Sequence, residues 1–191
     1  MLQLAEIFYS IQGEGEHTGK PAVFVRLAGC NLSCDFCDTD YSLKFFATVD
    51  DVVAKVRALG NDCPMVVLTG GEPFAQREAL DLIEALRKDG RRVHIESNGT
   101  IASDLPDDVW LTVSPKERVD ERMAKRANEV KLIVDEHVPE NWLELFADKK
   151  MLLLQPEGNK PKNVAIALEY AKAHPGRFRL SLQTHKFIGA Q

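Results

Sequence analysis

The sequence predicts an α/β fold in which a mostly parallel sheet forms an incomplete (β/α) barrel. Short apolar runs rich in β-branched residues recur along the chain, and helical stretches separate many of them. Such runs are typical of strands that are buried on both faces, as in a parallel sheet. The chain has 191 residues. A complete eight-unit barrel takes about 250 residues, so we expect the barrel to stay open.

Six apolar runs are predicted to be strands. The first follows a polar amino-terminal segment, Phe8 to Gly15, which by itself favours a turn. The later runs, from Trp110 onward, are separated by less convincing helices, which again favours an incomplete barrel. The predicted strands are Ala22–Ala28, Met65–Thr69, Arg92–Glu96, Trp110–Val113, Val130–Val134 and Met151–Leu154.

Four segments are predicted to be helical, and most of their ends carry recognisable signals. Thr48 can cap the first helix, with Asp51 three residues further on, and Gly60 can end it. The second runs from about Arg77 to Asp89 and is stopped by Gly90. The other two are Asn163–Ala173 and a shorter helix around Trp142–Phe146.

Composition limits the classes of partner. No internal repeat and no Pro/Gly/Ser-rich linker divides the chain, so residues 1–191 are expected to form a single domain. Lys and Arg number 24 against 29 Asp and Glu, a net charge of −5, which gives no basic field for nucleic acid or an anionic membrane. The chain start lacks a basic n-region, and no segment reaches the roughly 20 apolar residues of a membrane span. We expect a cytoplasmic protein that binds a small molecule or another protein.

Three of the four cysteines are clustered just after the first strong strand. Cys30, Cys34 and Cys37 have the spacing C-x3-C-x2-C. Full protein ligation of a 4Fe–4S cluster takes four thiolates, so three would leave one iron open for a ligand. That ligand can be the amino and carboxylate groups of a methionine moiety. The alternatives are a zinc site completed by Asp38 or a distant histidine such as His17 or His94, and a redox-switch set of thiols.

The remaining reactive residue types are assigned no chemistry. Cys63 opens an apolar run and is expected to behave as a small buried hydrophobic residue. Lys116 and His185 lie near predicted strand ends, where a lone Lys or His is usually solvated or hydrogen-bonded.

The strand after the cysteine loop ends in Thr69-Gly70-Gly71-Glu72-Pro73. This is the edge at which α/β sheets and barrels place their chemistry. Two glycines let the backbone approach a ligand closely, and Glu72 is expected to receive an ammonium group. Together with the cysteine loop, this turn predicts a site for a zwitterionic amino acid beside an open iron.

These motifs resemble the radical S-adenosylmethionine superfamily. The cysteine spacing with Phe36 before the last cysteine, the Gly70–Pro73 turn and Ser97-Asn98-Gly99 carry the resemblance. It implies that Cys30, Cys34 and Cys37 hold a 4Fe–4S cluster. It also implies a set of residues that face S-adenosylmethionine: Phe36, Asp38, Gly71, Ser97, Ser114, Pro115, Lys116, Gln155, Pro156, Glu157 and Gly158.

The amino-terminal segment points to the substrate. Gln12 and Glu14 offer hydrogen-bonding groups, and the Arg26 guanidinium suits bidentate contact with a carboxylate or a planar heterocycle. Within the superfamily, this segment and the ending Leu182–Gln191 are similar to members that convert 6-carboxy-5,6,7,8-tetrahydropterin to 7-carboxy-7-deazaguanine with loss of ammonia, on the route to queuosine. The resemblance implies that the pterin is bound by Gln12, Gly13, Glu14, Arg26, Thr69 and Gln191, the last closing over the substrate.

The same resemblance implies further partners. Thr39 matches a magnesium ligand, although the sequence alone favours an ordinary turn or cap residue there. An electron donor such as flavodoxin and a homodimer are also expected. Two other functions stay open: an activase for a glycyl-radical enzyme, which needs a groove for a polypeptide, and a non-catalytic iron–sulfur or zinc-binding module, which would not need the Gly70–Pro73 turn.

Overall fold

The computed structural model describes residues 1–149 and 151–191. Among these residues, nine strands form a sheet in the order β3-β1-β2-β4-β5-β6-β7-β8-β9. The strands are β1 (Leu2–Ile11), β2 (Pro21–Leu27), β3 (Phe45–Ala47), β4 (Met65–Gly70), β5 (Arg92–Ser97), β6 (Trp110–Val113), β7 (Glu129–Val134), β8 (Leu152–Pro156) and β9 (Phe178–Leu180).

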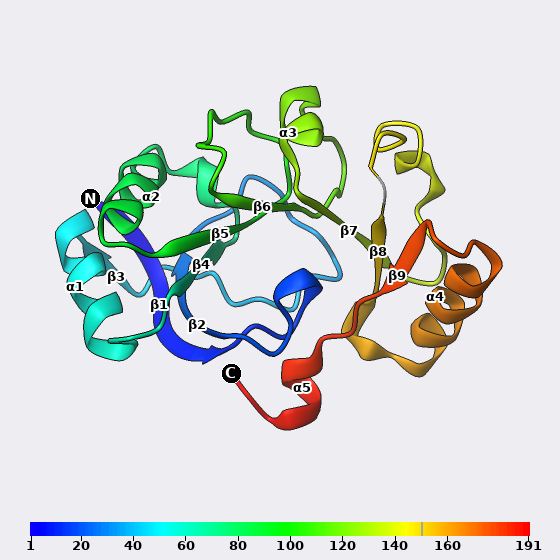
Figure 1. The fold of residues 1–191 in the computed structure, drawn as a ribbon, viewed down its shortest axis with the longest axis horizontal. Coiled ribbons are helices and arrows are strands. Elements are labelled where there is room, and N and C mark those ends of the chain that lie inside the picture. Colours follow the sequence, from blue (N-terminus) through cyan, green and yellow to red (C-terminus); the bar gives the residue numbers. More distant parts are fainter. Residues whose placement is uncertain (150) are drawn as a thin grey trace.

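The sheet is mostly parallel and open. Strand β1 pairs antiparallel with β2 and with β3, whereas every pair from β2–β4 to β8–β9 is parallel. The strands curve into an arc without closing, and helices lie on the outer side of the arc (Figure 1). The predicted incomplete (β/α) barrel is therefore confirmed.

Three of the predicted helices, α1 (Val49–Leu59), α2 (Glu78–Lys88) and α4 (Pro161–Ala173), are present, whereas α3 (Glu121–Arg126) and α5 (Thr184–Ile188) were not predicted. The 3-10 turns are η1 (Gly15–His17), η2 (Pro73–Ala75), η3 (Glu140–Trp142) and η4 (Glu157–Asn159). Helix α1 begins with a capping box in which Thr48 Oγ1 accepts from Asp51 N at 3.1 Å and Asp51 Oδ2 accepts from Thr48 N at 3.0 Å.

Two sequence-based expectations about elements are wrong. The segment Phe8–Gly15 does not precede the first strand, because β1 already runs to Ile11 and pairs with β2 through Ile11↔Pro21. The helix expected around Trp142–Phe146 is only the 3-10 turn η3 followed by turns. Its first turn closes with the bond from Trp142 N to Pro139 O at 3.3 Å, a 3-10 rather than an α-helical pattern.

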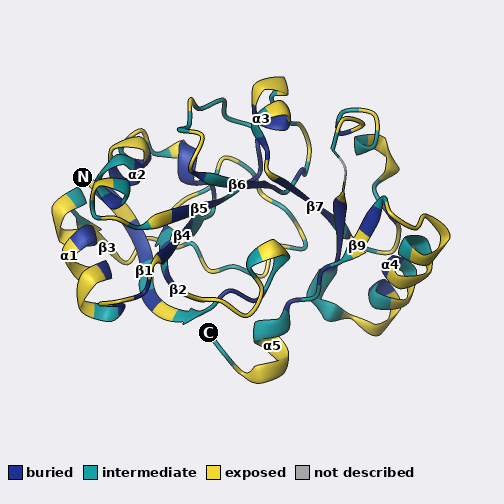
Figure 2. Ribbon diagram, in the orientation of Figure 1, coloured by how far each residue is buried: buried dark blue, intermediate teal, exposed yellow. Residues whose placement is uncertain are grey.

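The core fills the space between the sheet and the outer helices. Buried residues concentrate on the central strands and the inner faces of the helices (Figure 2). Cys63 belongs to this core, is 6% exposed, and donates from its thiol to the carbonyl oxygens of Pro21 and Met65. It behaves as the small buried hydrophobic residue that was expected. No helix among the described residues is long and apolar enough to cross a membrane.

Candidate functional site

A cavity of about 430 Å³ opens where the carboxyl ends of the parallel strands meet the cysteine loop and the end of the chain. This size suits a cofactor and a small substrate. Among the predicted site residues, those that line it are Gln12, Gly13, Glu14, Arg26, Phe36, Cys37, Asp38, Thr39, Thr69, Gly71, Ser97, Ser114, Lys116, Gln155, Glu157, Gly158 and Gln191. Cys30 and Cys34 lie behind this lining, and Pro115 and Pro156 are buried outside it.

The cysteine loop runs from the end of β2 and presents three free thiols. Cys30 and Cys34 are partly buried and Cys37 is exposed. A turn from Cys37 N to Cys34 O at 3.1 Å and a bond from Gly29 N to Tyr41 O at 3.0 Å fix the loop. Burial raises the pKa of the Cys30 and Cys34 thiols, so three adjacent thiolates require a cation that compensates their charge. In residues 1–149 and 151–191, no three His, Cys, Asp or Glu side chains converge tightly enough to hold a single ion.

Gly71 seats this loop against the end of β4. A Cβ atom at this position would lie 2.2 Å from Gly29 O and 2.5 Å from Cys30 Cβ. Glu72 N donates to Gly29 O at 3.1 Å, so the two loops are joined by backbone as well as by contact. The glycine therefore brings the cysteine loop close to the strand end, and this close approach fits a cluster carried beside the cavity.

The expectation that Glu72 receives an ammonium group is wrong. Its side chain is fully buried, and its carboxylate accepts hydrogen bonds from Ser97 Oγ at 2.9 Å, Asn98 N at 2.7 Å and Phe74 N at 3.1 Å. These bonds tie the end of β4 to the end of β5. Glu72 thus shapes the floor of the site and is not available to a ligand.

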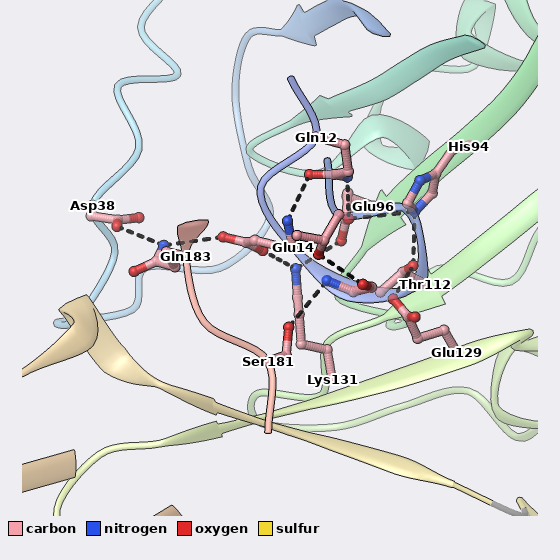
Figure 3. A network of polar contacts seen from close by, with 12 residues as sticks. Gln12, Glu14, Asp38, His94, Glu96, Thr112, Glu129, Lys131, Ser181 and Gln183 are labelled. Atoms are coloured by element: carbon pink, nitrogen blue, oxygen red, sulfur yellow. Dashed lines mark hydrogen bonds and ion pairs between the residues drawn. The ribbon is translucent and has the colours of Figure 1, made fainter. Parts of the chain in front are cut away.

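A buried cation lies between two cavity carboxylates (Figure 3). Lys131 Nζ on β7 bonds Glu14 and also donates to Glu96 Oε2 at 3.0 Å. Burial raises the pKa of Glu96 to about 7, against the attraction of Lys131. At Glu14 burial acts in the same direction, but the charge and hydrogen bond of Lys131 outweigh it and lower the pKa to about 2. The pair of carboxylates thus consists of a permanent anion and a group that titrates near neutral pH.

Glu96 also predicts a pH dependence of stability. Because its folded pKa is raised above the ordinary 4.5, its contribution is present below that value and is lost as the pH rises through about 7. We expect the thermal midpoint of Glu96→Gln to fall less than that of the unmodified chain between about pH 5 and pH 8. Exposed Glu144→Gln is the control. Equal slopes for all three proteins in a calorimetric series would contradict the assignment.

On the amino-terminal side, Arg26 is already paired. Its Nε donates to Glu6 Oε1 at 2.7 Å, and its guanidinium lies 5.9 Å from the centre of the Phe8 ring. Gln191 Nε2 donates to the other Glu6 oxygen at 2.8 Å, and the Gln191 carbonyl accepts from Ser10 Oγ. Glu6 therefore connects the guanidinium with the last residue of the chain, which closes this side of the cavity.

The carboxyl-terminal segment, residues 183–191, lines the cavity. It contacts Glu14, which was predicted to bind the substrate, and Asp38, which was predicted to bind S-adenosylmethionine. Gln183 Nε2 donates to Glu14 Oε1 at 3.1 Å and to Asp38 Oδ2 at 3.3 Å (Figure 3). Lys186 Nζ donates to the same Asp38 oxygen at 2.5 Å. Thr184 N donates to Gly13 O at 2.9 Å. A Cβ at Gly13 would lie 2.1 Å from His185 Nδ1, so this glycine admits the segment.

Lys116 faces the cysteine loop. Its Nζ lies 5.3 Å from the centre of the Phe36 ring, a cation–π contact, and burial lowers its pKa to about 8. The Cys34 and Cys37 thiols lie near enough that their negative charge would act in the opposite direction and raise the pKa of Lys116. This position places a cation beside the end of the loop that faces the cavity.

The cavity residues that sequence reasoning missed include Glu6, Glu96, Lys131 and Gln183. A signal was present for Lys131, the one charged residue inside the predicted apolar strand Val130–Val134. Glu96 precedes Ser97 at a predicted strand end, which is also a position where chemistry is expected. Glu6 and Gln183 gave no such signal, because their roles come from contacts with residues 20 and 169 positions away in the sequence.

Comparison with known proteins places this architecture in a class. The family model of the radical SAM superfamily matches residues 24–148, which include the cysteine loop and the glycine turn. The fold and the match define a radical S-adenosylmethionine protein. Curated relatives named 7-carboxy-7-deazaguanine synthase are 42% identical in Bacteroides thetaiotaomicron, over 98% of both chains, and 39% identical in Caulobacter vibrioides, over 96% of both. The chain belongs to the family of 7-carboxy-7-deazaguanine synthases.

A solved structure agrees with this assignment. The crystal structure of QueE from Escherichia coli superposes with a TM-score of 0.83 at 31% identity, covering 96% of this chain and 94% of the other. The similarity therefore extends over nearly the whole length of both chains. Membership in this superfamily implies a 4Fe–4S cluster and S-adenosylmethionine.

Proposed function

We propose that this chain converts 6-carboxy-5,6,7,8-tetrahydropterin to 7-carboxy-7-deazaguanine with release of ammonia, in the biosynthesis of queuosine and related deazapurines. The observation that carries the proposal is the shared cavity: the three-cysteine loop borders one side, and Glu14, Lys131 and Arg26 provide charged groups on the other. Such an arrangement suits a small polar ring with an acid group better than a polypeptide. The relatives' names support it.

Cys30, Cys34 and Cys37 are the proposed ligands of the 4Fe–4S cluster. Bound there, the cluster and S-adenosylmethionine would supply the radical chemistry of the reaction. The protein's part is to orient both ligands and exclude water. The residues proposed to face S-adenosylmethionine are Phe36, Asp38, Gly71, Ser97, Ser114, Pro115, Lys116, Gln155, Pro156, Glu157 and Gly158, and those proposed to face the pterin are Gln12, Gly13, Glu14, Arg26, Thr69 and Gln191.

The assay that tests this function combines the anaerobically reconstituted protein with the carboxytetrahydropterin, S-adenosylmethionine, Mg²⁺ and a reductant. We expect the deazaguanine product, detected by mass spectrometry, and an equal amount of released ammonia. Cleavage of S-adenosylmethionine without any deazaguanine would overturn the substrate assignment while leaving the radical chemistry intact.

Thr39 is the proposed protein ligand of Mg²⁺. Its side chain lines the cavity beside Asp38 and Asp40, and a single hydroxyl with substrate oxygens and water is a suitable set for this cation. Thr39→Ala is expected to raise the Mg²⁺ concentration for half-maximal activity about tenfold, measured by metal titration of product formation. The control Thr18→Ala removes a hydroxyl that bonds only Gly15 O in η1. An unchanged metal response in Thr39→Ala would place the cation elsewhere.

Three wider expectations belong to the same proposal. A homodimer is supported by the edge strand β3, where Phe45 and Phe46 are 41% and 56% exposed, and size-exclusion chromatography with light scattering tests it. The electron donor is proposed to be a protein such as flavodoxin. The net charge of −5 supports a cytoplasmic protein without nucleic-acid or membrane partners.

A further inference from the structure

A row of polar side chains in close contact leads from the cavity to the protein surface. Glu96 lines the cavity, and His94 lies two residues earlier on β5, on the same face of the strand. His94 Nε2 is 3.4 Å from Glu96 Oε1, and His94 Nδ1 is 3.2 Å from His17 Nδ1 in η1. His17 is only partly buried, so the row ends where water is accessible.

The central member of this row is a neutral imidazole. His94 is 1% exposed, and burial, followed by the charges of His17 and Lys131, holds its pKa well below the ordinary value. A neutral imidazole accepts at one nitrogen while it donates at the other, which is what transfer along the row requires. Its Nε2 is also 2.8 Å from Thr112 Oγ1. Because Thr112 Oγ1 donates to Glu129, it accepts from His94 Nε2, which leaves His94 Nδ1 to accept from His17.

Charged groups from several elements face this row. Lys131 on β7 contacts Glu96, and Glu14, from the loop after β1, bonds the same ammonium group. Glu129 on β7 accepts from Thr112 Oγ1 at 3.1 Å, and its charge also acts on Glu96. On the outer side, burial and then the charges of Lys20 and Arg92 lower the pKa of His17, and the charge of Glu16 raises it. The centre of the Trp110 ring lies 4.8 Å from the centre of the His17 ring.

A histidine with only a structural role in the core would need a hydrogen-bond partner for each ring nitrogen, but no connection to the surface or to the cavity. Here the second nitrogen of His94 is satisfied by another histidine, and that histidine is itself partly exposed. The other end reaches a cavity carboxylate that titrates near neutral pH. The order carboxylate, buried imidazole and surface imidazole is that of a route for protons.

We propose that Glu96 transfers protons to and from the substrate and that His94 and His17 connect it with solvent. The inference rests on the function proposed above, because loss of ammonia from a ring moves protons within the cavity. Glu96 is the group that would touch the substrate, whereas His94 and His17 act through it and are positioning residues.

The proton transfer is balanced. In the elimination, a C–H bond of the ring breaks and its electron pair forms the new ring double bond, while the proton forms an O–H bond on the Glu96 carboxylate. The C–N bond breaks with its pair on nitrogen, and the Glu96 O–H proton forms the N–H bond of the departing ammonia. His94 and His17 exchange protons between Glu96 and water when the two transfers are not simultaneous.

The reconstituted holoenzyme tests the carboxylate first. Glu96→Gln is expected to lower deazaguanine formation at least about 100-fold, while release of 5′-deoxyadenosine from S-adenosylmethionine continues. Infrared titration gives a readout that does not depend on turnover. A carboxylic-acid band with a midpoint near pH 7 is expected in the unmodified protein and should be missing in Glu96→Gln. Unchanged product formation or an unchanged infrared titration would overturn the assignment.

The surface end of the row is tested by chemical rescue. His17→Ala is expected to lower kcat about tenfold at neutral pH with KM unchanged, and added imidazole should restore it, since a small base can replace a partly exposed ring. Exposed His137→Ala is the control and should change neither value. A His17→Ala protein with full activity, or one whose loss no imidazole concentration restores, would overturn the route. Absence of product from the unmodified enzyme would instead refute the proposed function.

Discussion

Cys34→Ser is expected to reduce cleavage of S-adenosylmethionine to the level of a protein-free control. The hydroxyl of serine does not ionise at neutral pH, so the cluster would lose one of its three proposed thiolates. Cys34 is partly buried in the loop and forms no disulfide, so the fold itself should survive. The measurements are 5′-deoxyadenosine release after anaerobic reconstitution, bound iron per chain, and circular dichroism of the same sample.

Cys63 provides the matched control for this experiment. It is the one described cysteine outside the loop, and its thiol donates only to the backbone carbonyls of Pro21 and Met65. Cys63→Ala should therefore keep full iron content and cleavage activity, with a stability loss of about 1 kcal/mol. Normal cleavage by Cys34→Ser, or loss of iron from Cys63→Ala, would mean that the cluster ligands have been misassigned.

The central strands were predictable because their apolar runs are buried on both faces and leave a strong pattern. Strand β1 was missed for a physical reason. Its sequence mixes Gln3, Glu6 and Ser10 with apolar residues, because it pairs near the edge of the sheet and turns one face to the cavity. Its polar residues therefore suggested a turn, although antiparallel pairing with β2 makes it a ten-residue strand.

The candidate site was predictable where it consists of short motifs and not where it consists of long-range contacts. The spacing of Cys30, Cys34 and Cys37 is visible in the sequence alone. The direction in which Glu72 points is not, because it depends on hydrogen bonds to the end of β5. The pairing of Lys131 with Glu14 joins residues 117 positions apart, and only the curvature of the sheet brings them together.

Lys131→Met is expected to cause the largest loss of stability. The substitution would leave Glu14 and Glu96 buried beside each other without a cation. Removing one partner from a buried ion pair costs about 3–5 kcal/mol, which for a chain of this size lowers the thermal midpoint by on the order of 10 °C. Lys162→Met is the control, because Lys162 and Glu136 form a pair at 2.8 Å with both side chains exposed. Such a pair contributes about 0–1 kcal/mol.

The pH dependence separates loss of charge pairing from loss of packing in this variant. In the unmodified chain the lowered pKa of Glu14 gives stability that is present above its ordinary value of 4.5 and is lost as the pH falls toward about 2. Without Lys131, burial is the largest influence on Glu14, and only hydrogen bonds from Gln183 and Gln155 oppose it. The pKa of Glu14 should then rise, so stability should instead fall as the pH rises above 4.5. Adding Glu14→Gln to Lys131→Met should recover much of the thermal midpoint at neutral pH. If the double variant is no more stable than Lys131→Met, the loss comes from packing and the buried charge balance is not what holds this side of the cavity together.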